Sequence, residues 1–386
     1  MKKFYQLFSI VFALLFLCLP LIKHIYTGDE IKSEENRNLT QMPSQAINLT
    51  SLSKYTSQFD TYLADQFGFR DAFIRTANRL RYRLFNEATS KQITMGKNGF
   101  IFLNSHSAKH LYSLINNVCD IKPLTKNLQD DAIKVFSKFI KLYENQGYQT
   151  GIAIIPTKSR IYPENLLNPQ AEICQANTTT WLDKRVKEVT GRGIYYPLDK
   201  FRQWKSEFQV FLPAYFHWNG ELPYRVAEDM MKNYWHIEPK LEVKSENTSV
   251  ETDLKRFLFG LNIHDETKKY DYSPYKITSC KGAHCFKDLA HVYKRIIGFR
   301  YFKDSNTHRK LLILSDSFGA KITPHFIRGF DEVAMIELNR LKKKERLAFF
   351  ESVLTIEKPT HFLLLFHDGG SKGRTLLLNN ILSKYD

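Results

Sequence analysis

The sequence lacks several features that define common protein classes. Its 386 residues contain no internal repeat, no glycine-rich loop of the kind that cradles phosphate, and no second apolar run of membrane length. These absences exclude a repeat architecture, a phosphate-loop nucleotide enzyme and a catalyst built within the membrane. Cysteine is also scarce, with five residues in the whole chain. The protein must therefore fold around an apolar core, for which its length is ample.

One apolar run is present near the N-terminus. It covers residues 4–22, directly after Lys2 and Lys3, and at about 1.5 Å per residue it can cross most of a bilayer. No small-residue cleavage pattern follows it, so we expect residues 1–22 to be an uncleaved transmembrane anchor, with a cleaved signal peptide as the alternative. The two lysines predict a cytoplasmic N-terminus. We therefore expect a single-pass protein of the cell inner membrane whose globular part lies in the periplasm.

The other four cysteines would then lie in an oxidising compartment. Cys280 and Cys285 enclose a short loop with one glycine, so we expect these two to pair, and Cys119 to pair with Cys174 by elimination. A metal site that includes His284 is the weaker alternative, because zinc sites usually bring a second close pair of ligands and none is present. We expect no metal.

Basic residues outnumber acidic ones along the whole chain. The 56 lysines and arginines against 40 acidic residues give a formal net charge of +16. A basic surface attracts polyanions, and an exported chain meets acidic polysaccharides, anionic lipids or lipopolysaccharide phosphates rather than nucleic acid. A generally basic, solvated surface with no specific partner is the alternative.

Composition divides the chain into four parts. The anchor is followed by a polar linker or stalk at residues 23–50, by a helical lead-in at 51–90, and by an α/β domain at 91–386 with room for an insertion at 240–300. Gly68 breaks the lead-in into two helices. We expect these helices to pack on the α/β domain with their apolar positions in the core, namely Tyr55, Phe59, Tyr62, Leu63 and Phe67 and then Phe73, Ala77, Leu80 and Leu84.

A hydroxyl follows the most apolar strand of this domain. The run of residues 311–314 breaks into Ser315-Asp316-Ser317, so Ser317 is predicted at the tip of a strand that is covered on both faces. Such strands belong to parallel sheets, whose ligands bind at the carboxyl ends of the strands. Ser317 is therefore a candidate nucleophile. The alternative is that the Asp-Ser pair only caps a helix.

A histidine in an aromatic setting could act with this serine. His217 lies in Tyr215-Phe216-His217-Trp218, about a hundred residues upstream. Alone it would more often be a core residue, but beside a serine it is a candidate general base. His367 and Asp368, which follow the apolar run 362–366, are rival partners for Ser317, and we rank them below His217.

The order of the two motifs resembles the SGNH-hydrolase-like O-acetyltransferases of exopolysaccharide systems, which include alginate acetylation proteins of the AlgX and AlgJ type. That family carries Asp-x-His-Trp before Gly-Asp-Ser. Further matching motifs are Asn36-Arg37-x-Leu39 with Pro43, Phe67-Gly68-Phe69-Arg70-Asp71, Gly96-Lys97-Asn98-Gly99-Phe100-Ile101-Phe102, and Pro156-x-Lys158-x-x-Ile161-Tyr162-Pro163-Glu164.

The resemblance implies a flavodoxin-like parallel sheet flanked by helices, preceded by the transmembrane helix and the helical lead-in. It implies an O-acetyltransferase or acetylesterase that works through an acyl-enzyme on Ser317, with His217 as base and no cofactor. The acceptor would be a polysaccharide. A membrane-bound O-acyltransferase partner would relay the acetyl donor, and no nucleic acid is expected.

Two residues depart from the family pattern. Tyr215 stands where the family has its catalytic aspartate, and Ser315 stands where it has glycine. Tyr215 could accept a hydrogen bond from the imidazole, or Asp199 or Asp229 could supply the missing carboxylate. Without an acid the rate of a Ser-His pair falls steeply, so a catalytically disabled glycan-binding or assembly subunit is the second hypothesis.

Four residues near the two motifs remain as candidates for contact with the substrate or its oxyanion. Lys158 follows the strand at residues 151–155, although a lysine at the surface is the preferred alternative for it. The other three candidates are Asp316, Ser315 and Tyr215.

Overall fold

The computed structural model describes residues 2–30, 38–44, 49–88, 90–105, 107, 109–121, 124–167, 169–177, 179–293, 295–342 and 345–383. Asn36 and Arg37, and much of the linker predicted at residues 23–50, lie outside these ranges. The chain forms two compact units. The first comprises Met1–Ser90 and Leu254–Ile263, and the second comprises Lys91–Asp253 and His264–Asp386.

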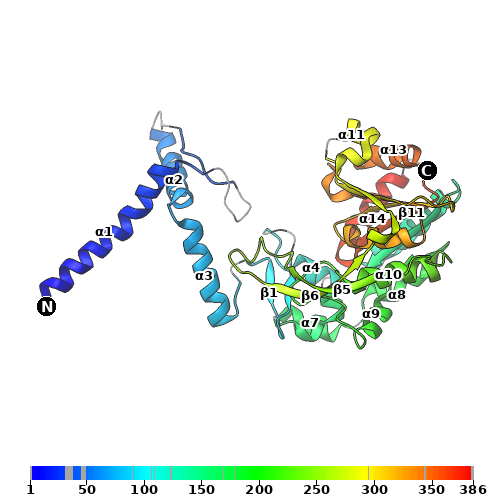
Figure 1. The fold of residues 1–386 in the computed structure, drawn as a ribbon, viewed down its shortest axis with the longest axis horizontal. Coiled ribbons are helices and arrows are strands. Elements are labelled where there is room, and N and C mark those ends of the chain that lie inside the picture. Colours follow the sequence, from blue (N-terminus) through cyan, green and yellow to red (C-terminus); the bar gives the residue numbers. More distant parts are fainter. Residues whose placement is uncertain are drawn as a thin grey trace. The chain divides into compact units, whose positions relative to one another are not determined.

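The first unit is helical (Figure 1). Its helices are α1 (Lys2–Thr27), α2 (Leu49–Gln66) and α3 (Arg70–Phe85). Within the described residues, α1 is the one helix long and apolar enough to cross a membrane. The predicted break at Gly68 is confirmed, and close packing requires glycine at this position, because a Cβ atom there would lie 2.2 Å from the Pro20 carbonyl oxygen.

The expected core position is confirmed for Tyr62 of α2, which is 8% exposed, but is wrong for the apolar stripe of α3. Phe73 is 46% exposed, Leu80 53% and Leu84 68%. The opposite side of α3 is held by the segment Leu254–Ile263, because the Asn78 side chain donates to the Phe259 carbonyl oxygen at 2.8 Å.

The second unit is built on a seven-stranded sheet of order β4-β3-β11-β9-β10-β8-β7. The first five strands run parallel, and β8 and β7 add an antiparallel edge. The bounds are β3 Gln149–Ile155, β4 Ile194–Tyr195, β7 Thr278–Lys281, β8 Gly298–Phe302, β9 Lys310–Ser315, β10 Glu332–Glu337 and β11 His361–His367.

The parallel strands are apolar because both faces of the sheet are covered. In β9, Leu312 and Leu314 face one layer while Leu311 and Ile313 face the other, and all four are fully buried. The sequence-based α/β fold class is confirmed. Because the strands are parallel, β3, β9 and β11 all end at one edge, where Lys158, Ser317 and Asp368 follow them.

Helices cover both faces of this sheet. One layer contains α5 (Lys126–Glu144), α8 (Trp181–Arg185), α11 (Lys287–Val292), α13 (Arg346–Glu357) and α14 (Ser371–Leu382). The other contains α10 (Glu221–Asp229), a π-helical turn η3 (Met230–Tyr234), α12 (Gly319–Ile322) and a 3-10 turn η6 (Thr323–Arg328). The remaining helices are α4 (Ser113–Val118), α6 (Lys158–Ile161), α7 (Pro169–Ala176) and α9 (Leu198–Trp204).

Two antiparallel pairs lie outside the main sheet. The hairpin β1 (Ile93–Met95) and β2 (Ile101–Leu103) begins the second unit, and β5 (Lys244–Glu251) pairs with β6 (His264–Asp271) as a ribbon. Residues 240–300, where the sequence leaves room for an insertion, thus supply this ribbon, β7 and the first residues of β8.

The expected disulfides are present. Cys119 is bonded to Cys174, and Cys280 to Cys285. The sulfurs of the last two are therefore bonded to each other rather than free to join His284 around a metal.

Candidate active site

Ser317 lies in a tight turn between β9 and α12. The buried Asp316 carboxylate holds this turn with both of its oxygens. Oδ1 accepts the Phe318 N–H at 3.0 Å, and Oδ2 accepts the His367 N–H of the neighbouring strand at 3.1 Å. Asp316 therefore positions the turn rather than facing a substrate. Ser317 itself is partly exposed at the sheet edge.

His217 faces the serine. Its Nε2 atom lies 2.8 Å from Ser317 Oγ. The next residue ties the two segments together, because the Trp218 indole N–H donates to the Phe318 carbonyl oxygen at 2.7 Å. The His217 ring also lies against the rings of Phe216 and Phe318, with centroids 4.9 and 5.1 Å away. The structure thus brings together the two residues that the sequence singled out.

A carboxylate that sequence reasoning missed lies behind the imidazole. Asp253 Oδ2 is 2.5 Å from His217 Nδ1 and also accepts the His217 backbone N–H at 3.0 Å, while Oδ1 accepts the Phe216 N–H at 2.8 Å. Burial alone would raise the pKa of Asp253, but these hydrogen bonds and the His217 ring outweigh burial, so its pKa lies below its usual value. Asp253 is therefore ionised where it orients the imidazole.

The three residues considered as substitutes for the missing acid do not fill this position. The Asp199 side chain is 91% exposed and pairs with Arg202. The Asp229 carboxylate accepts from the Tyr195 hydroxyl at 2.7 Å and from Lys200 at 2.5 Å. The Tyr215 hydroxyl makes no hydrogen bond to any described residue. The alternatives of Asp199 and Asp229 are therefore wrong, and the carboxylate is that of Asp253, which lies 36 residues after His217.

Lys158 is not the surface lysine that we preferred. It is 2% exposed, and its ammonium donates to the carbonyl oxygens of Leu212 at 3.3 Å, Pro213 at 2.6 Å and Tyr215 at 2.6 Å. Burial lowers its pKa to about 7, against the opposing effect of two nearby carboxylates, Asp253 and Asp265. Lys158 thus holds the segment before His217 and has no free donor direction towards a substrate.

The ribbon also holds this segment. The Ala214 N–H donates to Asp265 Oδ2 at 2.9 Å, and the Thr252 hydroxyl donates to the Ala214 carbonyl oxygen. Because Thr252 is adjacent to Asp253, the same contacts place the carboxylate behind His217. The carboxylate thus comes from the end of β5.

Ser315 faces away from the reacting groups. It is fully buried, and its hydroxyl donates to the Asp316 carbonyl oxygen at 2.6 Å. Its Oγ fills the space beside Gly319, where a Cβ atom would lie only 1.9 Å away. By contrast, the Ser317 N–H has no acceptor within the described part of the chain, so it can donate to a bound group.

The rival pair lies deeper in the fold. His367 Nε2 is 3.8 Å from Asp316 Oδ2, and the His367 ring stacks near Phe318. Asp368 accepts the Thr157 N–H at 3.2 Å, and burial raises its pKa to about 7 despite the opposing charge of Arg160. Neither residue is bonded to Ser317.

A pocket of about 270 Å³ opens beside the two motifs. Its lining includes Asn219, two residues after His217, and Lys321, four residues after Ser317. The Lys321 ammonium lies 5.5 Å from the centre of the Tyr215 ring. Burial lowers the pKa of Lys321, and the Asp253 carboxylate opposes that shift. The rest of the lining comes from α10, η6 and the ribbon, without an acidic side chain.

Comparison with protein-family models gives no match, and neither does comparison with curated proteins. Several solved structures are similar. A DHHW family protein from Eubacterium siraeum is 13% identical with a TM-score of 0.48, over 65% of this chain and 88% of that one. Bacillus cereus PatB1 with a sulfonyl adduct is 11% identical with a TM-score of 0.48, over 72% and 97%. The O-acetyltransferase domain of Pseudomonas putida AlgJ is 14% identical with a TM-score of 0.45, over 75% and 99%.

Proposed function

We propose that the protein is a membrane-anchored O-acetyltransferase or acetylesterase that acts on a cell-surface or secreted polysaccharide. The observation that carries this proposal is the line Ser317–His217–Asp253, with 2.8 Å between Ser317 Oγ and His217 Nε2 and 2.5 Å between His217 Nδ1 and Asp253 Oδ2. A hydroxyl, an imidazole and an ionised carboxylate in this order are the parts of a serine acyl-transfer site. The choice of acetyl and of a glycan follows the motif resemblance.

The reaction would take two steps. Ser317 Oγ attacks the acetyl carbonyl carbon while His217 Nε2 takes the hydroxyl proton, and that proton then passes to the departing donor group, leaving an acetyl ester on Ser317. A sugar hydroxyl, or water in an esterase, next gives its proton to His217 and attacks the ester, and the proton returns to Ser317 Oγ. Asp253 stabilises the imidazolium in both steps. The Ser317 N–H would donate to the oxyanion.

The acceptor would bind in the pocket beside Lys321. Its other cationic lining residues already have partners, because Lys268 pairs with Glu221 at 2.6 Å and Lys269 with Glu246 at 3.4 Å. Lys321 has no such ion pair among the described residues, and its ammonium would favour an acidic saccharide. The formal charge of +16 acts in the same direction.

The location of the site would follow from α1. The helix would anchor the chain in the inner membrane with the second unit in the periplasm, where acetyl-CoA is absent. A membrane-bound O-acyltransferase would then relay the acetyl group to Ser317. The main reason to consider a catalytically disabled subunit was the missing acid at Tyr215. That reason no longer applies, because the Asp253 carboxylate lies behind the imidazole.

Release of acetate from a chromogenic acetyl ester tests the proposal. The purified full-length chain in detergent is expected to hydrolyse the ester, and Ser317→Ala and His217→Ala are expected to reduce hydrolysis by about 10⁴-fold or more. Ser315→Ala is the matched control, since it removes a hydroxyl two residues away and should keep most of the activity. A folded chain with no more activity than Ser317→Ala would favour the disabled subunit and move the search to glycan binding.

A further inference from the structure

Helix α3 carries an exposed apolar stripe surrounded by arginines. Phe73, Ala77, Leu80 and Leu84 follow one another at spacings of four, three and four residues, which places them on one face of a helix. Three of these side chains are about half exposed or more, as given above for Phe73, Leu80 and Leu84. A soluble surface helix would turn such a stripe towards a core.

The rest of α3 is strongly basic. Its 16 residues contain Asp71 as the single acidic residue, and five arginines, at positions 70, 75, 79, 81 and 83. The side opposite the stripe is covered, because Asn78 and Arg79 donate to the carbonyl oxygens of Phe259 and Gly260, both at 2.8 Å. The exposed stripe flanked by arginines is the composition of a helix that lies in a membrane interface.

The start of α3 is held against the apolar helix α1. Gly68 packs directly on the Pro20 carbonyl oxygen, and the Lys23 ammonium lies 4.8 Å from the centre of the Phe69 ring. Pro20 is 16 residues after Phe4, the first residue of the apolar span, so it lies about 24 Å along a hydrocarbon core of about 30 Å. If α1 crosses the membrane, α3 therefore begins at the outer boundary of the hydrocarbon.

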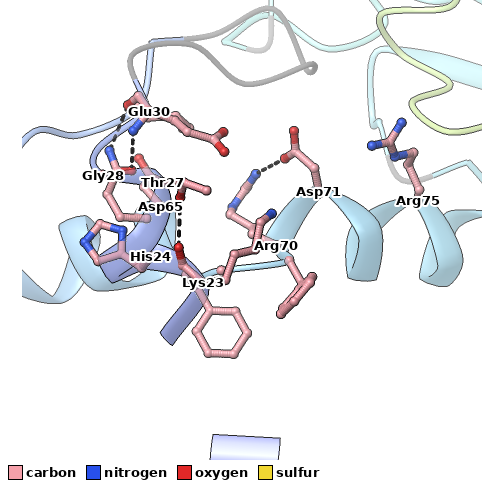
Figure 2. A pocket seen from close by; sticks show the side chains of 14 residues that line it. Lys23, His24, Thr27, Gly28, Glu30, Asp65, Arg70, Asp71 and Arg75 are labelled. Carbon is pink, nitrogen blue, oxygen red and sulfur yellow. Dashed lines mark hydrogen bonds and ion pairs between the residues drawn. The ribbon is translucent and has the colours of Figure 1, made fainter. Parts of the chain in front are cut away.

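Cationic side chains gather at the same level. Figure 2 shows the pocket of about 210 Å³ where α1 ends, and Lys23, Arg70 and Arg75 line it together with three carboxylates. Arg70 is paired with Asp71 at 3.3 Å. Phe67 and Phe69, on either side of Gly68, are each 40% exposed. Aromatic rings and basic groups at one depth are typical of the boundary between acyl chains and headgroups.

We propose that α3 lies in the outer interface of the membrane that α1 crosses, with its apolar stripe among the acyl chains and Arg81 and Arg83 against the phosphates of anionic phospholipids. This surface rests on the proposed anchoring of the chain and is independent of the proposed reaction. Arg81 and Arg83 both lie at exposed positions in the second half of α3. The second unit would then be tethered by two elements instead of one.

Depth-dependent fluorescence quenching tests the proposal in the full-length chain. The free cysteine is removed as Cys18→Ser, and Leu80→Cys is labelled with an environment-sensitive fluorophore after reconstitution into phosphatidylethanolamine–phosphatidylglycerol vesicles. The matched control is Lys54→Cys, an exposed position 12 residues before the end of α2, which is about 18 Å along the helix axis from that end. The first turns of α2 lie beyond the end of α1 (Figure 1). Quenching by a nitroxide-bearing lipid is expected to be roughly threefold or more stronger at position 80, with iodide quenching correspondingly weaker.

Each other result overturns the proposal. Equal iodide quenching at both positions would mean that the stripe faces water, and protection from both quenchers at position 80 would mean that protein covers it. Arg81→Glu with Arg83→Glu is expected to reduce lipid quenching in anionic vesicles and leave it unchanged in neutral ones. Failure of the chain to float with vesicles would overturn the anchor as well, whereas hydrolysis of the acetyl ester reports on the active site separately.

Discussion

Two histidine–carboxylate pairs lie close to the Ser317 turn, and they differ in every property that matters for catalysis. His217 and Asp253 are 2.5 Å apart, with side chains 24% and 17% exposed. His367 and Asp316 are 3.8 Å apart, with side chains 8% and 3% exposed. In the first pair the second imidazole nitrogen reaches Ser317 Oγ, whereas in the second pair the carboxylate is occupied by backbone N–H groups.

The difference separates chemistry from support. The outer pair leaves one imidazole nitrogen for the hydroxyl and one carboxylate for the imidazole, which proton transfer requires. In the inner pair, the Asp316 carboxylate holds the Ser317 turn through the backbone N–H groups of Phe318 and His367. Ser317 therefore keeps its position while His217 transfers a proton. A histidine beside an acid at a strand end is therefore insufficient to identify a base.

The largest effect is expected from Asp253→Asn. The amide keeps the size of the side chain but cannot stabilise the imidazolium and favours the wrong imidazole tautomer, so kcat/KM for a chromogenic acetyl ester should fall by about 10⁴-fold. Steady-state kinetics of the full-length chain measure this, with circular dichroism to establish that the variant is folded.

His367→Gln is the matched test of the inner pair. Its backbone N–H still donates to Asp316, so we expect less than about a tenfold loss of kcat/KM. A larger loss than in Asp253→Asn would exchange the roles assigned to the two pairs.

The stability of the second unit should also depend on pH through the buried Asp368. Its pKa is raised from 3.8 to about 7 by burial, so between these values the unfolded chain has lost the proton while the folded chain keeps it. The contribution of Asp368 to stability should therefore fall as the pH rises from 4 to 7, by up to roughly 4 kcal/mol, and then level off. His325 and His361, whose pKa values burial lowers to about 3 and about 4, contribute slopes of the opposite sign over part of this range. The contribution of Asp368 is therefore measured as the difference between the parent and Asp368→Asn, which lacks it.

All four tryptophans, at positions 181, 204, 218 and 235, belong to the second unit, so their fluorescence during denaturant unfolding reports on it. Equal pH slopes in the two proteins would mean that Asp368 is ionised in the fold.

The strands of this site could be predicted from the sequence because they are unusually apolar. The run at residues 311–314 has no polar position, and such a strand has to be buried on both faces. The polar residues that follow it then had to lie at the edge of the sheet, which identified Ser317. His217 was identified instead from its aromatic setting and from the order of the two motifs.

Asp253 could not be found in the same way. It follows β5, whose residues Lys244–Glu251 show no apolar alternation because both faces of the ribbon are largely exposed. No local pattern marks this strand, and one aspartate in a polar segment looks like any other. The only signal was indirect. The motif resemblance placed Tyr215 where an aspartate is expected, so an acid had to come from another segment. The burial of Lys158 was missed because the three carbonyl oxygens that hold its ammonium are distant in sequence.

A moderate effect is expected from Asp316→Asn. The amide offers one acceptor oxygen to two backbone N–H groups, those of Phe318 and His367, and turns an N–H towards the other. Leaving a buried donor without an acceptor costs about 1–3 kcal/mol, which denaturant unfolding should register. Activity should fall with the order of the turn, less than in Asp253→Asn. Unchanged stability would show that Asp316 does not hold the turn.

The smallest effect is expected from Tyr215→Phe. Tyr215 was one of the candidates for the missing partner of His217, but its hydroxyl is bonded to no described residue, and its contribution is the backbone carbonyl oxygen that accepts from Lys158 at 2.6 Å. Phenylalanine keeps that carbonyl and the ring beneath Lys321, so kcat/KM should stay within about twofold of the parent. Comparison with Asp253→Asn in the same ester assay measures the contrast between the two sources of an acid. A tenfold loss of kcat/KM in Tyr215→Phe would mean that the phenol hydroxyl orients His217 directly. Asp253 would then share that function with Tyr215.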